Sequence, residues 1–312
     1  MPKMFQMRIT MLRAIFLTLL LLNCLITKAE TNITSTEVYQ QIILIERETE
    51  LIRQHFQENK KNIQTTETTA DIKPRHVWQK CYMLQIKLVA FRRKHHLIGF
   101  APVGIEPIGQ FDSVHNWAQT QRILTEIRII RKILGIKKEI DNKLPNITDK
   151  NNLDIYNKLN QIEALWDELS SSHLDASYTF DQILRINEDI AMILRQLNVF
   201  DSAIPPKKHR ENTAADSLAQ AFLLLEQVQR LQQLAGIETI DLSDFKQKNN
   251  ITSAQVFNIV CLILAEIQTI KAKIGLNHYI TPPATYHENK TSADVQQFLG
   301  YITNKLALIQ HL

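Results

Sequence analysis

The amino-acid sequence predicts an all-α protein: eight long amphipathic helices in a tandem duplication of a four-helix unit, joined by long inter-helix loops. Three observations support this prediction, namely an internal repeat, a helical apolar stripe within each repeat, and capping residues at the helix ends. The composition agrees with them. Only 7 of 312 residues are glycine, well below the usual share of about 7%, which disfavours turn-dense β-sandwiches and glycine-rich phosphate loops.

The internal repeat is marked by one anchor residue near the start of each helix. Five of the seven intervals between successive anchors are 39 residues long, one is 38 and one is 24. Each unit has room for one long helix rather than the two helices of common helical solenoids. The anchors are Tyr39, Trp78, Trp117, Tyr156, Phe180, Leu218, Phe257 and Gln296.

Apolar residues recur at fixed positions around each anchor, at −1, +3, +6, +10, +13 and +17. Steps of three and four residues place them on one face of a helix and on no single face of a strand. Position +6 shows the pattern: Ile45, Leu84, Ile123, Ile162, Ile186, Leu224, Ile263 and Ile302. Position +9 is polar in seven of the eight repeats, and we expect it to face solvent: Glu48, Lys87, Glu126, Asp189, Gln227, Glu266 and Lys305, with Leu165 the exception.

The helix ends carry capping residues in the same register. Five residues before each anchor, seven of the eight repeats have a side chain that can accept bonds from the first-turn N–H groups. These are Thr34, Asp112, Asn151, Asp175, Thr213, Thr252 and Thr291, and in the remaining repeat Lys73 precedes Pro74. Gly135, Asn198, Gly236 and Gly275 stand where a left-handed residue would close a helix.

The single 24-residue interval divides the chain into two modules, 30–174 and 175–312. Residues 123–136 match residues 263–276 at six of fourteen positions, which favours a duplication. Extended loops of about 15 residues reach roughly 50 Å. They could therefore return along a helix and join parallel neighbours, or they could cap the bundle ends, and the sequence leaves the helix directions open.

Residues 1–29 have the features of a secretory signal peptide cleaved near Ala29, with a basic start, an apolar stretch from Ala14 to Ile26 and small residues at the cleavage site. An uncleaved membrane anchor is the alternative. We therefore expect a periplasmic or secreted protein without stable membrane insertion after cleavage. The formal charge of +4 arises from four basic residues in this segment. The remainder is neutral, which argues against a nucleic-acid partner.

Motifs for catalysis, metal binding or cofactor binding are missing from the sequence, so we expect no catalytic residues, no metal site and no cofactor. His95, His96 and His115 would approach one another if the second and third helices were antiparallel; otherwise they are cations at helix ends. Cys81 occupies the apolar position +3 and is therefore expected to be a buried thiol. The alternative, a bridge to Cys261, would have to cross the module boundary.

These observations predict an exported, non-enzymatic helical-repeat protein that acts as a binding or scaffold module for a protein or envelope partner. The alternative is a periplasmic sensor-like or carrier bundle that binds a small ligand or metal. Polar residues on the apolar stripe would line such a pocket: Thr49, His95, Asn116, Thr120 and His173. Glycosylation is a separate open question, because Asn-x-Thr sequons occur at Asn32, Asn146, Asn250 and Asn289.

Overall fold

The computed structural model describes residues 33–56, 67–97, 106–107, 109, 111–170, 174–246, 250–283 and 285–310. Within these ranges the regular structure is helical and contains no strand, so the all-α prediction is confirmed. Residues 34–312 group into one compact unit. The predicted signal peptide and Asn32 lie outside the described residues, as does His173.

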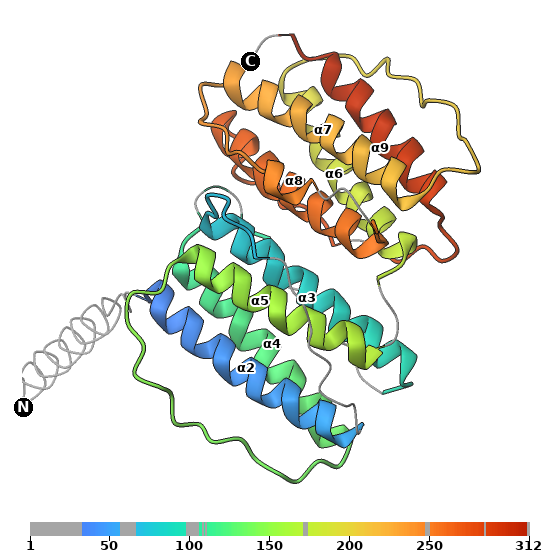
Figure 1. Ribbon diagram of the computed structural model, residues 1–312. Helices are drawn as coiled ribbons and strands as arrows, with labels where there is room; N and C mark the ends of the chain where they lie inside the picture. Colours follow the sequence, from blue (N-terminus) through green and yellow to red (C-terminus); the bar gives the residue numbers. More distant parts are fainter. Residues whose placement is uncertain are drawn as a thin grey trace, which may run out of the picture. The chain divides into compact units, whose positions relative to one another are not determined.

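Each helix begins at the residue that directly follows its predicted cap (Figure 1). The short 3₁₀ helix η1 (Ser243–Phe245) precedes α8. The long helices are α2 (Ser35–His55), α3 (Pro74–Lys94), α4 (Ser113–Ile133), α5 (Asn152–Ser170), α6 (Ala176–Gln196), α7 (Ala214–Leu234), α8 (Ser253–Lys273) and α9 (Ser292–Ala307).

Capping explains these boundaries. The side chains of Thr34, Asp112, Asn151, Asp175, Thr213, Thr252 and Thr291 each accept a first-turn N–H. At the other end, Gly135, Asn198, Gly236 and Gly275 have positive φ values between 55° and 81°, as predicted. His96, at φ 50°, ends α3 in the same way, although its side chain gives no sequence signal for this conformation. Local sequence therefore determines where the helices start and stop.

The helices form two groups with the same internal arrangement. In the first module, α2 and α3 each pack on both α4 and α5. In the second module, α6 and α7 each pack on both α8 and α9. In each group the first two helices are therefore diagonal to each other, and so are the last two. The shared arrangement agrees with a duplicated unit, although common descent of the two halves stays a prediction.

All four helices of each module run in the same direction. The starts of α2 and α4 meet where Ser35 Oγ lies 3.4 Å from Ser113 Oγ, and toward their ends Arg131 Nε lies 3.0 Å from Glu48 Oε2. The second module repeats this between α6 and α8: Thr179 Oγ1 donates to the Ser253 carbonyl at 3.4 Å near the starts. Toward the ends, Lys271 pairs with Asp189 at 2.8 Å.

Parallel neighbours require each connection to run back along the bundle, one of the two options that the sequence leaves open. The segment 134–151 does so along the outside of α2 (Figure 1), where Arg47 donates to the carbonyls of Asp141 and Lys143. The segment 198–212 runs back along α9, whose Gln297 and Asn304 donate to its carbonyls. An extended chain of about 15 residues spans more than the roughly 32 Å of a 21-residue helix, so the loop lengths suit this path.

The apolar stripe is buried from position −1 to position +13, and the residues at +6 and +13 form the core of each module. Position +17, at the helix ends, is only partly buried in the described residues. The expectation that position +9 faces solvent is wrong at five positions, where the side chain is at most 5% exposed: Glu48, Lys87, Asp189, Glu266 and Lys305. The reason is the parallel packing. Position +9 flanks the stripe, and a neighbouring helix in the same direction covers it.

In four helices, position +9 pairs with position +14 of a parallel neighbour, and both modules use equivalent helix pairs. Lys87 and Lys305, also at +9, pair instead with Asp167 and Asp201. Between the first and third helices, Glu48 pairs with Arg131 and Asp189 with Lys271. Between the third and second helices, Glu126 pairs with Arg92 and Glu266 with Gln232. An offset of five residues between two flanking positions matches the g and e positions of a parallel coiled coil, where such pairs set helix direction.

The two modules contact each other through α3 and α8, which are antiparallel. Along α3 from His76 to Lys80, the partner on α8 moves backwards from Glu266 to Asn258. A buried apolar cluster lies beside these polar contacts: Met83, Ala90, Leu174, Phe257 and Cys261. This contact explains why α8, which is long and apolar enough to cross a membrane, has most of that apolar stretch buried inside the protein.

We expect the helix direction to be testable with paired cysteines. Oxidation of a Ser35→Cys/Ser113→Cys protein should give an intrachain disulfide, because these side chains meet at the starts of α2 and α4. A Ser35→Cys/Ile133→Cys protein is the control, since Ile133 ends α4. Non-reducing mass spectrometry of peptides identifies the bridge, and bridging in the control alone would show antiparallel helices.

Stability measurements test both the core and the domain boundary. Ile123 and Ile263 are fully buried at +6 of α4 and α8, and truncation to alanine should cost about 2–5 kcal/mol each through lost transfer energy and a cavity. We expect both changes to shift one cooperative transition in urea, because α3 and α8 couple the modules. Two separate transitions, each moved by only one variant, would instead establish independent domains. The exposed control Glu226→Ala should change stability by no more than about 0.5 kcal/mol.

Candidate ligand-binding cleft between the modules

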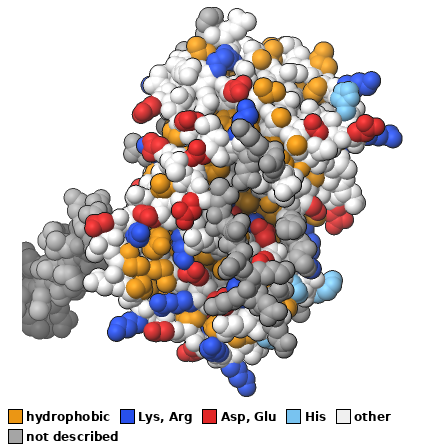
Figure 2. All heavy atoms as spheres, in the orientation of Figure 1, with side chains coloured by type: hydrophobic (Ala, Val, Ile, Leu, Met, Phe, Trp, Pro, Cys, Tyr) orange, Lys and Arg blue, Asp and Glu red, His pale blue; other side chains and the backbone are white. Residues whose placement is uncertain are grey.

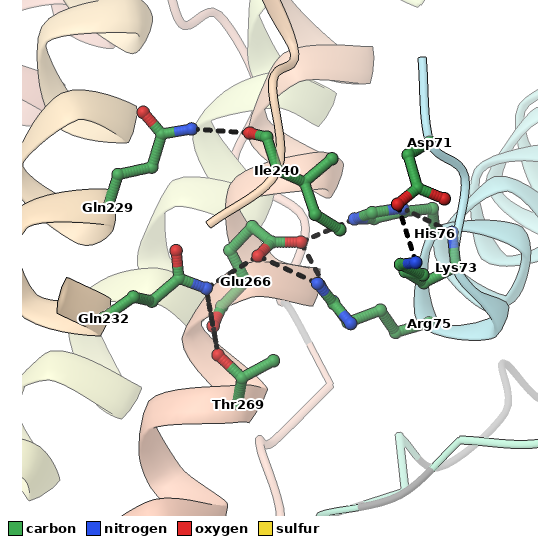
Figure 3. Close-up of polar contacts among 9 residues, drawn as sticks. All are labelled: Asp71, Lys73, Arg75, His76, Gln229, Gln232, Ile240, Glu266 and Thr269. Atoms are coloured by element: carbon green, nitrogen blue, oxygen red, sulfur yellow. Dashed lines mark hydrogen bonds and ion pairs between the residues drawn. The ribbon is translucent and has the colours of Figure 1, made fainter. Parts of the chain in front are cut away.

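Glu266 is the centre of a polar cluster that joins the modules (Figure 3). Arg75 from α3 donates to both of its carboxylate oxygens, at 2.9 and 3.1 Å. His76 Nε2 lies 2.5 Å from Oε1. Gln232 from α7 donates to Oε2 at 2.6 Å and to Thr269 Oγ1 at 3.0 Å. The carboxylate is 1% exposed, so the module contact contains a buried and well-paired charge.

The hydrogen bonds assign the proton on His76. Its Nδ1 accepts from the Lys73 backbone N–H at 3.0 Å, so the proton of a neutral ring is on Nε2 and points at Glu266. Burial lowers the pKa of His76, more than the neighbouring carboxylate raises it. Burial alone would raise the pKa of Glu266, but the bond from His76 and the charge of Arg75 hold it at about 2. The cluster therefore contains a neutral histidine and an ionised glutamate.

A second polar connection joins the modules through Glu106, a buried residue after α3. Arg185 from α6 and Gln79 from α3 both donate to its carboxylate. The Arg185 guanidinium also lies 4.4 Å from the centre of the Tyr82 ring, within cation–π distance. Burial raises the pKa of Glu106 to about 7, because the charge of Arg185 only partly offsets the desolvation of the carboxylate.

A cleft of about 400 Å³ lies at the same module junction. It is bordered by α3 and α5 of the first module and by η1 and α8 of the second. Its polar lining includes Thr68, Lys80, Lys87, Asn160, Glu163, Asp167, Asp244, Gln255 and Asn258, and its apolar lining includes Met83, Ala164, Phe245 and Ile259. The volume is in the range of small-molecule sites.

Glu163 is the buried acid of this cleft. Its Oε2 accepts from Lys80 Nζ at 2.5 Å, and both side chains are at most 6% exposed. Its Oε1 is buried and has no hydrogen-bond partner among the described residues. Burial lowers the pKa of Lys80, although the charge of Glu163 opposes this. Lys80 also donates to Asn258 Oδ1 at 3.3 Å, and that oxygen accepts from the Tyr156 hydroxyl at 3.0 Å.

One carboxylate oxygen in the cleft thus accepts no bond from the residues that the structure describes. Buried acceptors in native proteins almost always have a partner, which can be water or a ligand. The cleft residues are neither motif members nor polar interruptions of the stripe, so the sequence analysis missed them. Only the packing of α3 and α5 against α8 brings them together.

The histidines and cysteines that the sequence analysis weighed as candidate site residues do not form a site in the described part of the chain. His95 and His96 follow the end of α3, and His115 lies at the beginning of α4. Because the two helices are parallel, His115 lies at the opposite end of the module from His95 and His96. His95 packs on Phe91 and Phe56, with ring centres 4.3 and 5.0 Å apart. No group of three potential metal-binding side chains occurs among the described residues. Cys81 and Cys261 are both buried and unbridged.

Three of the polar interruptions of the stripe, Thr49, Asn116 and Thr120, are buried in the first module and do not line the cleft at the module junction. Thr49 Oγ1 donates to the Ile45 carbonyl at 2.8 Å and accepts from Trp166 Nε1 at 3.1 Å. Thr120 Oγ1 donates to the Trp117 carbonyl at 2.8 Å. Asn116 is 1% exposed. The first two are thus satisfied by the bundle itself, and the ligand pocket predicted among these residues is not seen in the part of the chain that the structure describes.

The surface carries mixed charge. Acidic and basic side chains are interspersed over the face shown in Figure 2, without one large field of either sign. Exposed apolar side chains include Val114, Ile129 and Ile133 on α4 and Leu223 and Leu234 on α7. No family model, curated protein or solved structure matches this chain.

The pH dependence of stability should report the Glu266 cluster. The pKa of His76 is lower in the folded protein than its ordinary 6.5. The folded state therefore becomes less stable as pH falls below 6.5, because the unfolded chain binds the proton more readily. The pKa of Glu266 changes from 4.5 in the unfolded chain to about 2 in the folded protein. Its contribution to the free energy of unfolding is therefore full above pH 4.5 and is lost as pH falls toward 2. Urea unfolding from pH 8 to pH 3 measures both losses.

Variants separate Glu266 from other acids. Glu266→Ala should cost about 3–5 kcal/mol at pH 7, because it leaves the buried partners of the carboxylate unpaired. This difference from the unmodified protein should shrink below pH 4.5. Glu126→Ala, the same position in α4, breaks a pair within one module and should cost less. Equal costs for the two variants would contradict a special role for the module junction.

Proposed function

We propose that this protein is an exported, non-enzymatic binding protein, built by duplication of a four-helix unit, that holds a small polar ligand between its two modules. The observation that supports the proposal is the buried Glu163 Oε1, which lines a cleft of about 400 Å³ and has no partner among the described residues. This observation supports a ligand site at the junction rather than inside one bundle.

The packing of the modules favours this location. The stripe residues are buried in each module, and the polar threonines among them bond to neighbouring helices or to their own backbone. At the junction, by contrast, side chains of α3 and α5 face side chains of η1 and α8 across a cleft with a largely polar lining. A site between two rigid packed units is a common location for small-molecule binding.

A protein or envelope partner is the second candidate, and the exposed apolar residues on α4 favour it. Ile129 and Ile133, one turn apart at the end of α4, are 43% and 45% exposed, and neighbouring exposed apolar residues are typical of interaction sites. Under this reading, Ile129→Lys/Ile133→Lys should abolish a measured complex with a purified partner, while Ala164→Phe in the cleft leaves it intact. The opposite result would favour the cleft.

The cleft can be tested by filling it. Ala164 lines it from α5, and Ala164→Phe should occupy the space that a ligand needs. The unmodified protein is incubated with small molecules from the native host, separated by gel filtration and denatured, and the released compounds are identified by mass spectrometry. We expect at least one compound that Ala164→Phe fails to retain.

The matched control for this experiment is Ala219→Phe, an equal increase in side-chain volume at an exposed position of α7. It should retain the compound, and both variants should unfold at a urea concentration close to that of the unmodified protein. Identical retention by all three proteins would contradict a binding site in the cleft.

A further inference from the structure

We infer that the ligand of the inter-module cleft is a small organic ammonium ion with a short alkyl chain, and that Glu163 Oε1 accepts a hydrogen bond from its ammonium group. This inference rests on the proposed function and specifies the class of ligand. It follows from the partners of Glu163, the balance of charge around the cleft and the apolar side chains in its wall.

The unpaired atom of Glu163 is the carboxylate oxygen Oε1, which accepts hydrogen bonds. Its other oxygen is already bonded to Lys80, which donates to Asn258 as well. A ligand at Oε1 must therefore bring an N–H or O–H donor. A charged donor forms the stronger bond to a carboxylate, because both partners are ionised.

The charges around the cleft favour a cation. Four carboxylates line it, Glu67, Glu163, Asp167 and Asp244, against two lysines. Both lysines are paired with carboxylates, since Lys80 contacts Glu163 and Lys87 lies 2.8 Å from Asp167. An anionic ligand would therefore find no unpaired cation among these residues, whereas a dication would offset the net charge of the lining.

The shape of the lining distinguishes an organic cation from a metal ion. Met83, Phe245 and Ile259 contribute apolar surface that an alkyl chain can cover and a hydrated metal ion cannot. In the carboxylates of Glu163 and Asp167, one oxygen already binds a lysine ammonium within 2.8 Å, which leaves few oxygens toward the six or more ligands that Mg²⁺ or Ca²⁺ takes. A short diamine combines the required donor, charge and apolar chain.

Isothermal titration calorimetry with three probes of similar length tests the charge of the ligand. The probes are 1,4-diaminobutane, 1,4-butanediol and succinate, measured at one ionic strength, with magnesium chloride as the inorganic cation. We expect saturable 1:1 binding of the diamine. The diol, succinate and magnesium should bind at least 10-fold more weakly, because none combines an ionised donor with an alkyl chain.

Variants locate the binding. Glu163→Gln should weaken diamine binding at least 10-fold, while Glu168→Gln, on the same helix outside the cleft lining, should leave it unchanged. Since Glu163→Gln removes the charge paired with buried Lys80, Ala164→Phe serves as the second variant, and it should abolish diamine binding with every charge in place.

Any other result contradicts either the chemical class of the ligand or its location in the cleft. If the diol or succinate binds as tightly as the diamine and Ala164→Phe blocks it, the ammonium class is wrong and the cleft remains a binding site. If the diamine binds equally to Ala164→Phe, the bound diamine lies elsewhere and the inference fails. If no probe binds the unmodified protein, the inference also fails, and the retention experiment with host compounds alone decides the proposed function.

Discussion

The structure depends on the pairing of flanking side chains between parallel helices. A buried charge at position +9 is costly to desolvate and stabilises the fold only when its partner is in place. The five-residue offset to position +14 of the neighbour exists only if both helices run in the same direction. Glu48 with Arg131 and Asp189 with Lys271 form this pair in equivalent helices of the two modules. Antiparallel packing would leave these charges buried without partners.

The long connections follow from the same constraint. Helices that all run in one direction need a return path as long as a helix, so short turns cannot join them. Segments 134–151 and 198–212 lie along the bundle surface and are held there by side chains such as Arg47 and Gln297. Every long helix begins four residues before its anchor, and six of the eight end sixteen residues after it, which keeps the pairing in register.

The module junction uses this pattern and adds to it. Glu266 has the expected partner, Gln232, inside its own module. It also accepts bonds from Arg75 and His76 of the first module, so one residue serves both the bundle and the contact between bundles. The cleft beside it contains Lys80 and Glu163, an ion pair of the first module that faces the second. The contact between the modules and the candidate ligand site therefore both involve charged side chains buried at the junction.

The sequence by itself determined the helices, because their causes are local. Cap residues, left-handed residues such as Gly135 and the three-and-four spacing of the stripe act within one or two turns. The helix directions were also encoded in the charges at positions +9 and +14, but this signal is visible only once both positions are compared between helices. Only the tertiary structure decided that His115 lies apart from His95, that Glu266 is buried, and that Glu163 lines a cleft with Asn258. These outcomes depend on contacts between residues far apart in the chain. Cap residues and apolar spacing act within one helix, so they do not specify which surfaces of the two four-helix modules pack together.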